Sequence, residues 1–106
     1  MAKTLVRPPE NKEFYIKSAE IFKVMSNAKR LEIMDIVKGR EVTVNEISNT
    51  LGTRKSNTSQ HLAYLRYVGI VTARRDGKNI YYKLIDPEIM ETCKILDNVK
   101  IKSFLA

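Results

Sequence analysis

The chain has 106 residues, of which 43% are hydrophobic, and a formal net charge of +7. This size fits one small domain, and this hydrophobic content argues against a disordered chain. The sequence has no apolar run of membrane-spanning length and only one cysteine, which excludes a membrane span and an internal disulfide framework. We therefore expect a cytoplasmic protein without a membrane partner.

The predicted elements begin with an arm and two helices. Residues 1–12 include two consecutive prolines and are expected to form a loose arm, followed by a single domain over residues 13–106. Apolar side chains recur at helical spacing over residues 14–25, which predicts an amphipathic helix. Residues 31–37 are apolar over much of a helical surface, which predicts a second helix near the centre of the domain.

The next segment predicts a short extended piece at residues 41–43 and a third helix. Thr43 and Glu46 have the spacing of a capping box, in which each side chain accepts a hydrogen bond from the other residue's backbone amide. Gly52 is expected to end this helix. A three-residue connector, residues 53–55, then leads into a fourth helix.

The fourth helix is predicted to have one buried and one polar face. On a helical wheel Thr58, Leu62 and Leu65 fall together and are expected to face the core. The opposite face carries short polar side chains in its first two turns. A helix that enters the major groove of DNA by its N-terminal end needs this arrangement. The third and fourth helices thus predict a helix-turn-helix unit; the alternative is two ordinary packed helices with a solvated polar face.

A β-hairpin is predicted directly after this helix pair. Residues 70–75 and 79–84 alternate as strands do, and Asp76 and Gly77 between them favour a tight turn. Six of the seven net positive charges lie within residues 54–83. The hairpin therefore resembles a wing that reaches DNA, although its charges could instead only prevent edge pairing. The predicted fold class is mainly helical with a small β-hairpin, a winged helix-turn-helix of order α-α-(β)-α-α-β-β-α.

The predicted partner is double-stranded operator DNA. Phosphates require a localised basic surface, and base edges require hydrogen-bonding side chains on a rigid element. Gln60 is the side chain best suited to a paired contact with one base, for instance adenine. The residues expected at the DNA are Arg54, Lys55, Ser56, Asn57, Ser59, Gln60, Arg74, Arg75, Lys78 and Asn79.

Three segments carry a resemblance to a known family. They are FKVMSNAKRLEIMDIV, TVNEISNTLGTRKSNTSQHLAYLRYVGIVTARRDGKNIYYKL and DPEIMETCKIL. Through them the chain resembles the ArsR/SmtB family of winged-helix repressors. The resemblance implies a homodimer that pairs through its first and last helices and represses its own operon until a ligand releases it. The expected interface residues are Phe14, Phe22, Ile89, Cys93, Leu96 and Val99.

The effector sites of that family do not carry over to this sequence. Its metal-sensing members use a cysteine-rich stretch in the third helix or Asp and His ligands along the last helix. Here the third helix has no thiol, and the last helix, which Asp86 and Pro87 are expected to open, has no histidine. One cysteine and one histidine cannot supply the converging donors that such metals need. We expect no metal site and no cofactor, and the sequence does not identify an effector.

Cys93 has two interpretations. It falls on the apolar face of the last helix, where a cysteine is most often a small buried hydrophobe. Alternatively, symmetry could bring two copies of Cys93 together in a dimer and make a thiol-redox-responsive repressor. Family sensors of persulfide use two cysteines in each subunit, and this chain has one.

Two other classes of function compete with operator binding. The sequence has no Ser/His/Asp motif and no glycine-rich phosphate loop, so we predict that the protein is not an enzyme. A winged helix can also bind protein or RNA without binding an operator. Substituting the outward residues of the fourth helix distinguishes an operator-binding protein from a protein- or RNA-binding one. The first would cease to bind duplex DNA, and the second would keep duplex binding but lose its partner.

Overall fold

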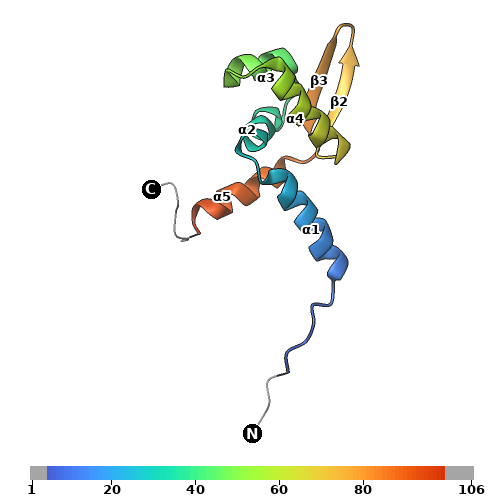
Figure 1. Cartoon of the computed structure of the whole chain (residues 1–106), viewed down its shortest axis with the longest axis vertical. Helices are drawn as coiled ribbons and strands as arrows, with labels where there is room; N and C mark the ends of the chain where they lie inside the picture. Colours follow the sequence, from blue (N-terminus) through green and yellow to red (C-terminus); the bar gives the residue numbers. More distant parts are fainter. Residues whose placement is uncertain (1–4, 100–106) are drawn as a thin grey trace.

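The computed structural model describes residues 5–99, and within them it shows the winged helix-turn-helix order predicted from the sequence (Figure 1). Figure 1 shows α3, α4 and the hairpin of β2 and β3 at one end of the molecule, and α1 and α5 at the other. The elements are α1 (Lys12–Met25), α2 (Ala28–Val37), β1 (Val42–Thr43), α3 (Val44–Leu51), α4 (Lys55–Tyr67), β2 (Val71–Asp76), β3 (Asn79–Leu84), the 3-10 helix η1 (Pro87–Met90) and α5 (Glu91–Asp97).

Local sequence signals explain where several helices begin and end. The predicted capping box is confirmed: the Glu46 amide donates to Thr43 Oγ1 and the Thr43 amide donates to Glu46 Oε1, both at 3.2 Å. Helix α3 ends at Gly52, whose φ of 65° is a left-handed conformation that glycine adopts without strain. At α1, the Phe14 amide donates to Asn11 Oδ1 at 3.0 Å. These bonds satisfy amides that a helix N-terminus otherwise leaves unpaired.

Helix α2 lies at the centre of the core, as its apolar surface predicts. Ile33, Met34 and Val37 are fully buried. Their neighbours in the buried cluster include Ile47 from α3 and Leu62 from α4. The apolar sides of the three helices therefore share one core, which fixes α4 against α2 and α3 and leaves the other face of α4 free.

The sheet has three strands where the sequence predicted two. The hairpin is confirmed, with β2 and β3 paired antiparallel from Val71 opposite Leu84 to Asp76 opposite Asn79. The extended piece predicted at residues 41–43 adds β1 to the other edge of β3, giving the order β1-β3-β2. This pairing was not predicted because the partner strand is far away in the chain.

The two ends of the described chain differ slightly from expectation. Of the predicted arm, residues 5–11 have no helix or strand, and residues 1–4 lie outside the described part, as do residues 100–106 of the predicted domain. Asp86 caps the last helical segment as predicted, accepting from the Glu88 amide at 2.9 Å. The first turn is a 3-10 helix before α5 begins. No helix within residues 5–99 is both long and apolar enough to cross a bilayer.

Candidate nucleic-acid interface

Helix α4 buries one face and exposes the other, as the sequence predicts. Thr58 has 1% of its surface exposed, and Leu62 and Leu65 have none. Its exposed residues include four from the predicted reading set, namely Ser56, Asn57, Ser59 and Gln60. They lie in the first two turns, where helix N-terminal amides also favour a nearby phosphate. The polar face can therefore approach a duplex without disturbing the core.

A chain of hydroxyl groups joins α3 to α4 beneath this face. Buried Ser48 donates from its Oγ to Thr58 Oγ1 at 3.0 Å, and Thr53 Oγ1 lies 2.8 Å from the same oxygen. The bonds connect the end of α3, the connector and the first turn of α4, so they help to set the angle between the two helices. Sequence analysis did not identify Ser48, although its position four residues after Val44 places it on the apolar side of α3.

We expect Thr58→Val to destabilise the protein by about 1–3 kcal/mol, because a shape-preserving change removes the shared partner of two hydroxyl groups. Urea unfolding, monitored by circular dichroism, measures this difference in the free energy of unfolding. Thr72→Val is the matched control, since Thr72 is exposed on β2 and its hydroxyl makes a longer bond, 3.4 Å, to the Lys83 carbonyl. Equal effects of the two substitutions would contradict a structural role for the buried chain.

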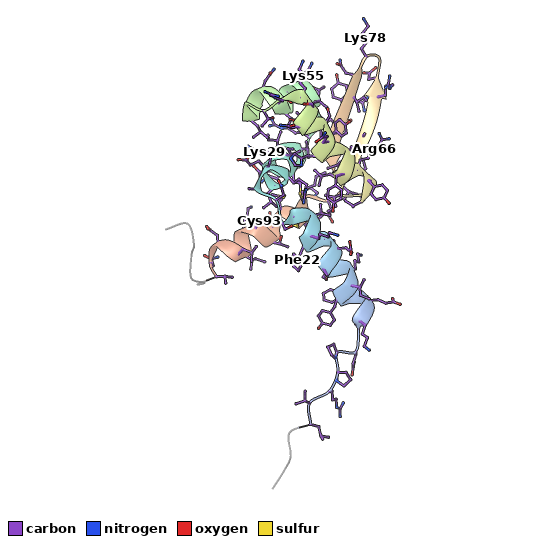
Figure 2. All side chains as sticks on the ribbon, viewed as in Figure 1. Phe22, Lys29, Lys55, Arg66, Lys78 and Cys93 are labelled. Atoms are coloured by element: carbon purple, nitrogen blue, oxygen red, sulfur yellow. The ribbon has the colours of Figure 1, made fainter. Side chains whose placement is uncertain are left out.

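The basic residues predicted to contact DNA are exposed both at the N-terminus of α4 and at the tip of the hairpin. Arg54 is the N-cap residue of α4 and Lys55 is its first helical residue, although the sequence placed Lys55 in the connector. Arg75, Lys78 and Asn79 are exposed at the tip of the hairpin. Figure 2 shows Lys55 and Lys78 toward the same end of the molecule. The fold thus brings these parts of the predicted DNA-binding set to one side.

Arg74 differs from the other predicted wing contacts. Its Nε donates to Glu41 Oε2 at 2.7 Å and its Nη2 to Glu41 Oε1 at 3.3 Å, while its guanidinium lies 5.0 Å from the centroid of the Tyr81 ring. The hydrogen bond from Arg74 lowers the pKa of Glu41 below its usual value, so the carboxylate is charged at neutral pH. Arg74 therefore ties the hairpin to the residue before β1, and its expected contact with DNA stays a prediction.

His61 lies on α4, and the charged residues that act on it, Arg30 and Lys29, belong to α2. Its side chain is partly buried, and this burial, followed by the charges of Arg30 and Lys29, lowers the pKa of His61 below 6.5. The imidazole is therefore neutral at pH 7. In the part of the chain that the structure describes, His61 belongs to no group of three potential metal ligands.

The opposite end of the molecule carries the predicted dimer residues. Phe14, Phe22, Leu96 and Val99 are 55%, 58%, 61% and 48% exposed. Ile89 and Cys93 are half-buried against the core. A hollow of about 210 Å³ lies between α1 and the last helical segment, lined by Ser18, Ile21, Phe22, Met25, Ile89 and Thr92. Exposed aromatic and aliphatic groups beside an apolar hollow are typical of a surface that another protein covers.

Within residues 5–99 no three His, Cys, Asp or Glu side chains gather in a way that could hold a metal ion. The expectation that the protein has no metal site stays a prediction.

Cys93 is a half-buried free thiol on α5. We expect inert packing, so mild peroxide should change DNA affinity equally in the parent and in Cys93→Ser, as measured by fluorescence anisotropy. A response confined to the parent would instead establish the thiol switch.

Comparison with known proteins agrees with this geometry. The family described as bacterial regulatory protein, arsR family, matches residues 27–73. An HTH-type transcriptional regulator of Mycobacterium tuberculosis is 35% identical over 91 residues, which cover 85% of this chain and 80% of that protein. The transcriptional activator HlyU of Vibrio cholerae is 34% identical over 80 residues, covering 76% of this chain and 74% of HlyU.

Solved structures show the same relationship. Reduced HlyU from Vibrio cholerae superposes with a TM-score of 0.74 at 30% identity, covering 88% of this chain and 98% of that one. NolR from Sinorhizobium fredii gives a TM-score of 0.73 at 33% identity, covering 89% and 94%. The fold and the exposed polar helix define a winged helix-turn-helix transcriptional regulator. The chain belongs to the ArsR family of bacterial regulatory proteins, which confirms the resemblance found in the sequence.

Proposed function

We propose that the protein binds a specific double-stranded operator as a homodimer and represses transcription from it. Each α4 enters a major groove, and each wing approaches the neighbouring backbone. The observation that carries this proposal is the polar N-terminal half of α4, whose opposite face is locked into the core by Thr58, Leu62 and Leu65. A rigid helix that presents short hydrogen-bonding groups is what base recognition in a groove requires.

The proposed homodimer pairs through α1 and α5. Their exposed apolar groups lie at the end of the molecule away from the wing, so two copies can join there while both α4 helices stay accessible (Figure 1). Two-fold pairing then places two recognition helices on one side of the DNA, where they fit half-sites about one helical turn apart. An operator for this protein is therefore expected to have two related halves.

Repression is the proposed consequence, because a dimer that occupies promoter DNA excludes other proteins from it. HlyU of Vibrio cholerae, a relative, is named an activator. A reporter gene placed beside the identified operator gives the sign of the effect directly. A rise in transcription when the protein is present would overturn repression and leave operator binding untouched.

Footprinting on the DNA that flanks the protein's own gene tests the central proposal. We expect a protected region containing two related half-sites, and an affinity for it at least about a thousandfold above that for an unrelated duplex at physiological salt. A duplex with both half-sites scrambled is the control. Equal affinity for the two duplexes at every salt concentration would contradict sequence-specific operator binding.

The wing's role predicts a change in salt dependence. Arg75 and Lys78 form no ion pair within residues 5–99, so the double variant Arg75→Ala, Lys78→Ala should bind all sequences more weakly. The slope of log affinity against log salt should fall by about four units, because each of the two subunits loses two phosphate contacts and each lost contact lowers the slope by about one. Lys38→Ala, a lysine paired with Asp35 on α2, is the control. An unchanged slope in the double variant would remove the wing from the DNA.

A further inference from the structure

Arg30 connects two helices that the proposed function uses for different purposes. It lies in the first turn of α2, and its guanidinium reaches back to the last turn of α1. Nε donates to the Val24 carbonyl at 2.6 Å, and Nη2 donates to the Lys23 carbonyl at 3.3 Å. The final carbonyls of a helix have no partner within the helix, and the helix dipole favours a cation at this end. The Lys23 carbonyl also accepts from the amide and the hydroxyl of Ser26, so the main contribution of Arg30 is its bond to the Val24 carbonyl.

The same guanidinium also contacts α4. Its Cζ lies 4.8 Å from the centroid of the Tyr64 ring, within the range of a cation–π interaction. Tyr64 is half-buried and packs against the core, on the flank of α4 next to its outward face. One planar group therefore touches the end of α1 with its donor edge and the recognition helix with its face. A lysine could not reproduce both contacts, because an ammonium group lacks the fork and the flat face.

We propose that Arg30 is a positioning residue that sets the orientation of α4 relative to α1 and thereby selects the distance between half-sites. The proposal rests on the proposed function, in which α1 joins the two subunits and α4 reads the DNA. If α1 is held by the partner subunit, the angle between α1 and α4 decides where the second recognition helix meets the duplex. A small change of that angle moves the two recognition helices apart or together.

The structure favours this role over a direct phosphate contact by Arg30. Its side chain is partly buried, and its donors point at carbonyl groups of α1 while its face lies on an aromatic ring. The two roles predict different results when Arg30 is replaced. Removing a phosphate-binding cation from both subunits lowers the salt slope by about two units, one for each lost contact, and weakens every duplex alike. Removing a positioning group leaves the salt slope unchanged and alters the preference for half-site spacing.

The test compares the affinity of the full-length protein for its operator with that for duplexes whose half-sites are one base pair closer or farther apart. The parent should prefer the natural spacing. In Arg30→Met and in Tyr64→Leu the ratio of the affinity for the natural spacing to that for the shifted spacings should fall by about three- to tenfold, with an unchanged salt slope. Tyr64→Phe, which keeps the ring, is the matched control and should behave as the parent does. The variant with both Arg30→Met and Tyr64→Leu should show no larger effect than either alone, because both remove the same interaction.

Two outcomes overturn the proposal. One is a salt slope reduced by about two units in Arg30→Met, one for each subunit, which would mean that Arg30 binds a phosphate. The other is an unchanged spacing preference in Tyr64→Leu, which tests the interaction even if Arg30→Met does not fold, as judged by circular dichroism. If the parent binds the natural operator no more tightly than a duplex with both half-sites scrambled, the proposed function itself fails and not this role of Arg30 alone.

Discussion

Phe22→Glu is expected to convert the protein to monomers at micromolar concentration and to reduce operator affinity by more than about a hundredfold. Phe22 is 58% exposed in the single subunit and lines the hollow between α1 and the last helical segment. A two-fold interface would bury two unpaired carboxylates, at a cost of several kcal/mol for each. Because about 1.4 kcal/mol changes an equilibrium constant tenfold, dimerisation fails and each subunit binds a single half-site.

Sedimentation velocity and operator binding measure the two effects together. Because Phe22 lies at the surface of the subunit, Phe22→Glu should leave the buried core intact. Its unfolding temperature should therefore be close to that of a single subunit with the parent's core. Phe22→Leu is the matched control, since it keeps an apolar group at the same place and should remain dimeric. A parent protein that sediments as a monomer at micromolar concentration would contradict the expected dimer interface on α1 and α5.

Gln60→Ala is expected to cost about 1–3 kcal/mol for each half-site of the cognate operator and to relax the sequence preference at one position in each half-site. Gln60 is exposed in the second turn of α4, and its amide can both donate to and accept from one base edge. Its removal leaves the buried face of α4 intact, so the folded structure and the phosphate contacts should not change.

Selection from an operator library randomised at each position measures this preference. Lys55→Ala is the contrasting variant: it removes one cation from each subunit and should weaken all sequences alike while lowering the salt slope by about two units. Gln60→Ala should leave the salt slope unchanged. An identical preference in Gln60→Ala and the parent across the library would exclude Gln60 from base reading.

Much of the fold was predictable from local patterns. The capping box of Thr43 and Glu46, the left-handed Gly52 and the turn at Gly77 depend on residues a few positions apart, so short-range hydrogen bonds and backbone preferences decide them. The buried face of α4 was also predictable, because helical periodicity alone places Thr58 and Leu62 on one side.

Other parts of the site required the tertiary structure. Arg74 and Arg75 are neighbouring cations that the sequence could not distinguish, yet only Arg74 is paired with Glu41, 33 residues away. The hydroxyl chain of Ser48 and Thr58 likewise joins two helices. The sequence of α3 does not show that Ser48 contacts Thr58, and the sequence of α4 does not show it either.

The order of the elements and the exposed polar face of α4 could be predicted from the sequence, because periodicity, capping and turn chemistry act over a few residues. The family was predicted separately, from the resemblance that three segments of the chain carry. The third strand, the pairing of Arg74 with Glu41 and the contacts of Arg30 with Val24 and Tyr64 became known from the folded chain. Those depend on how close the packed elements bring side chains that are distant in sequence, and a distance between packed elements is not a local property of the chain.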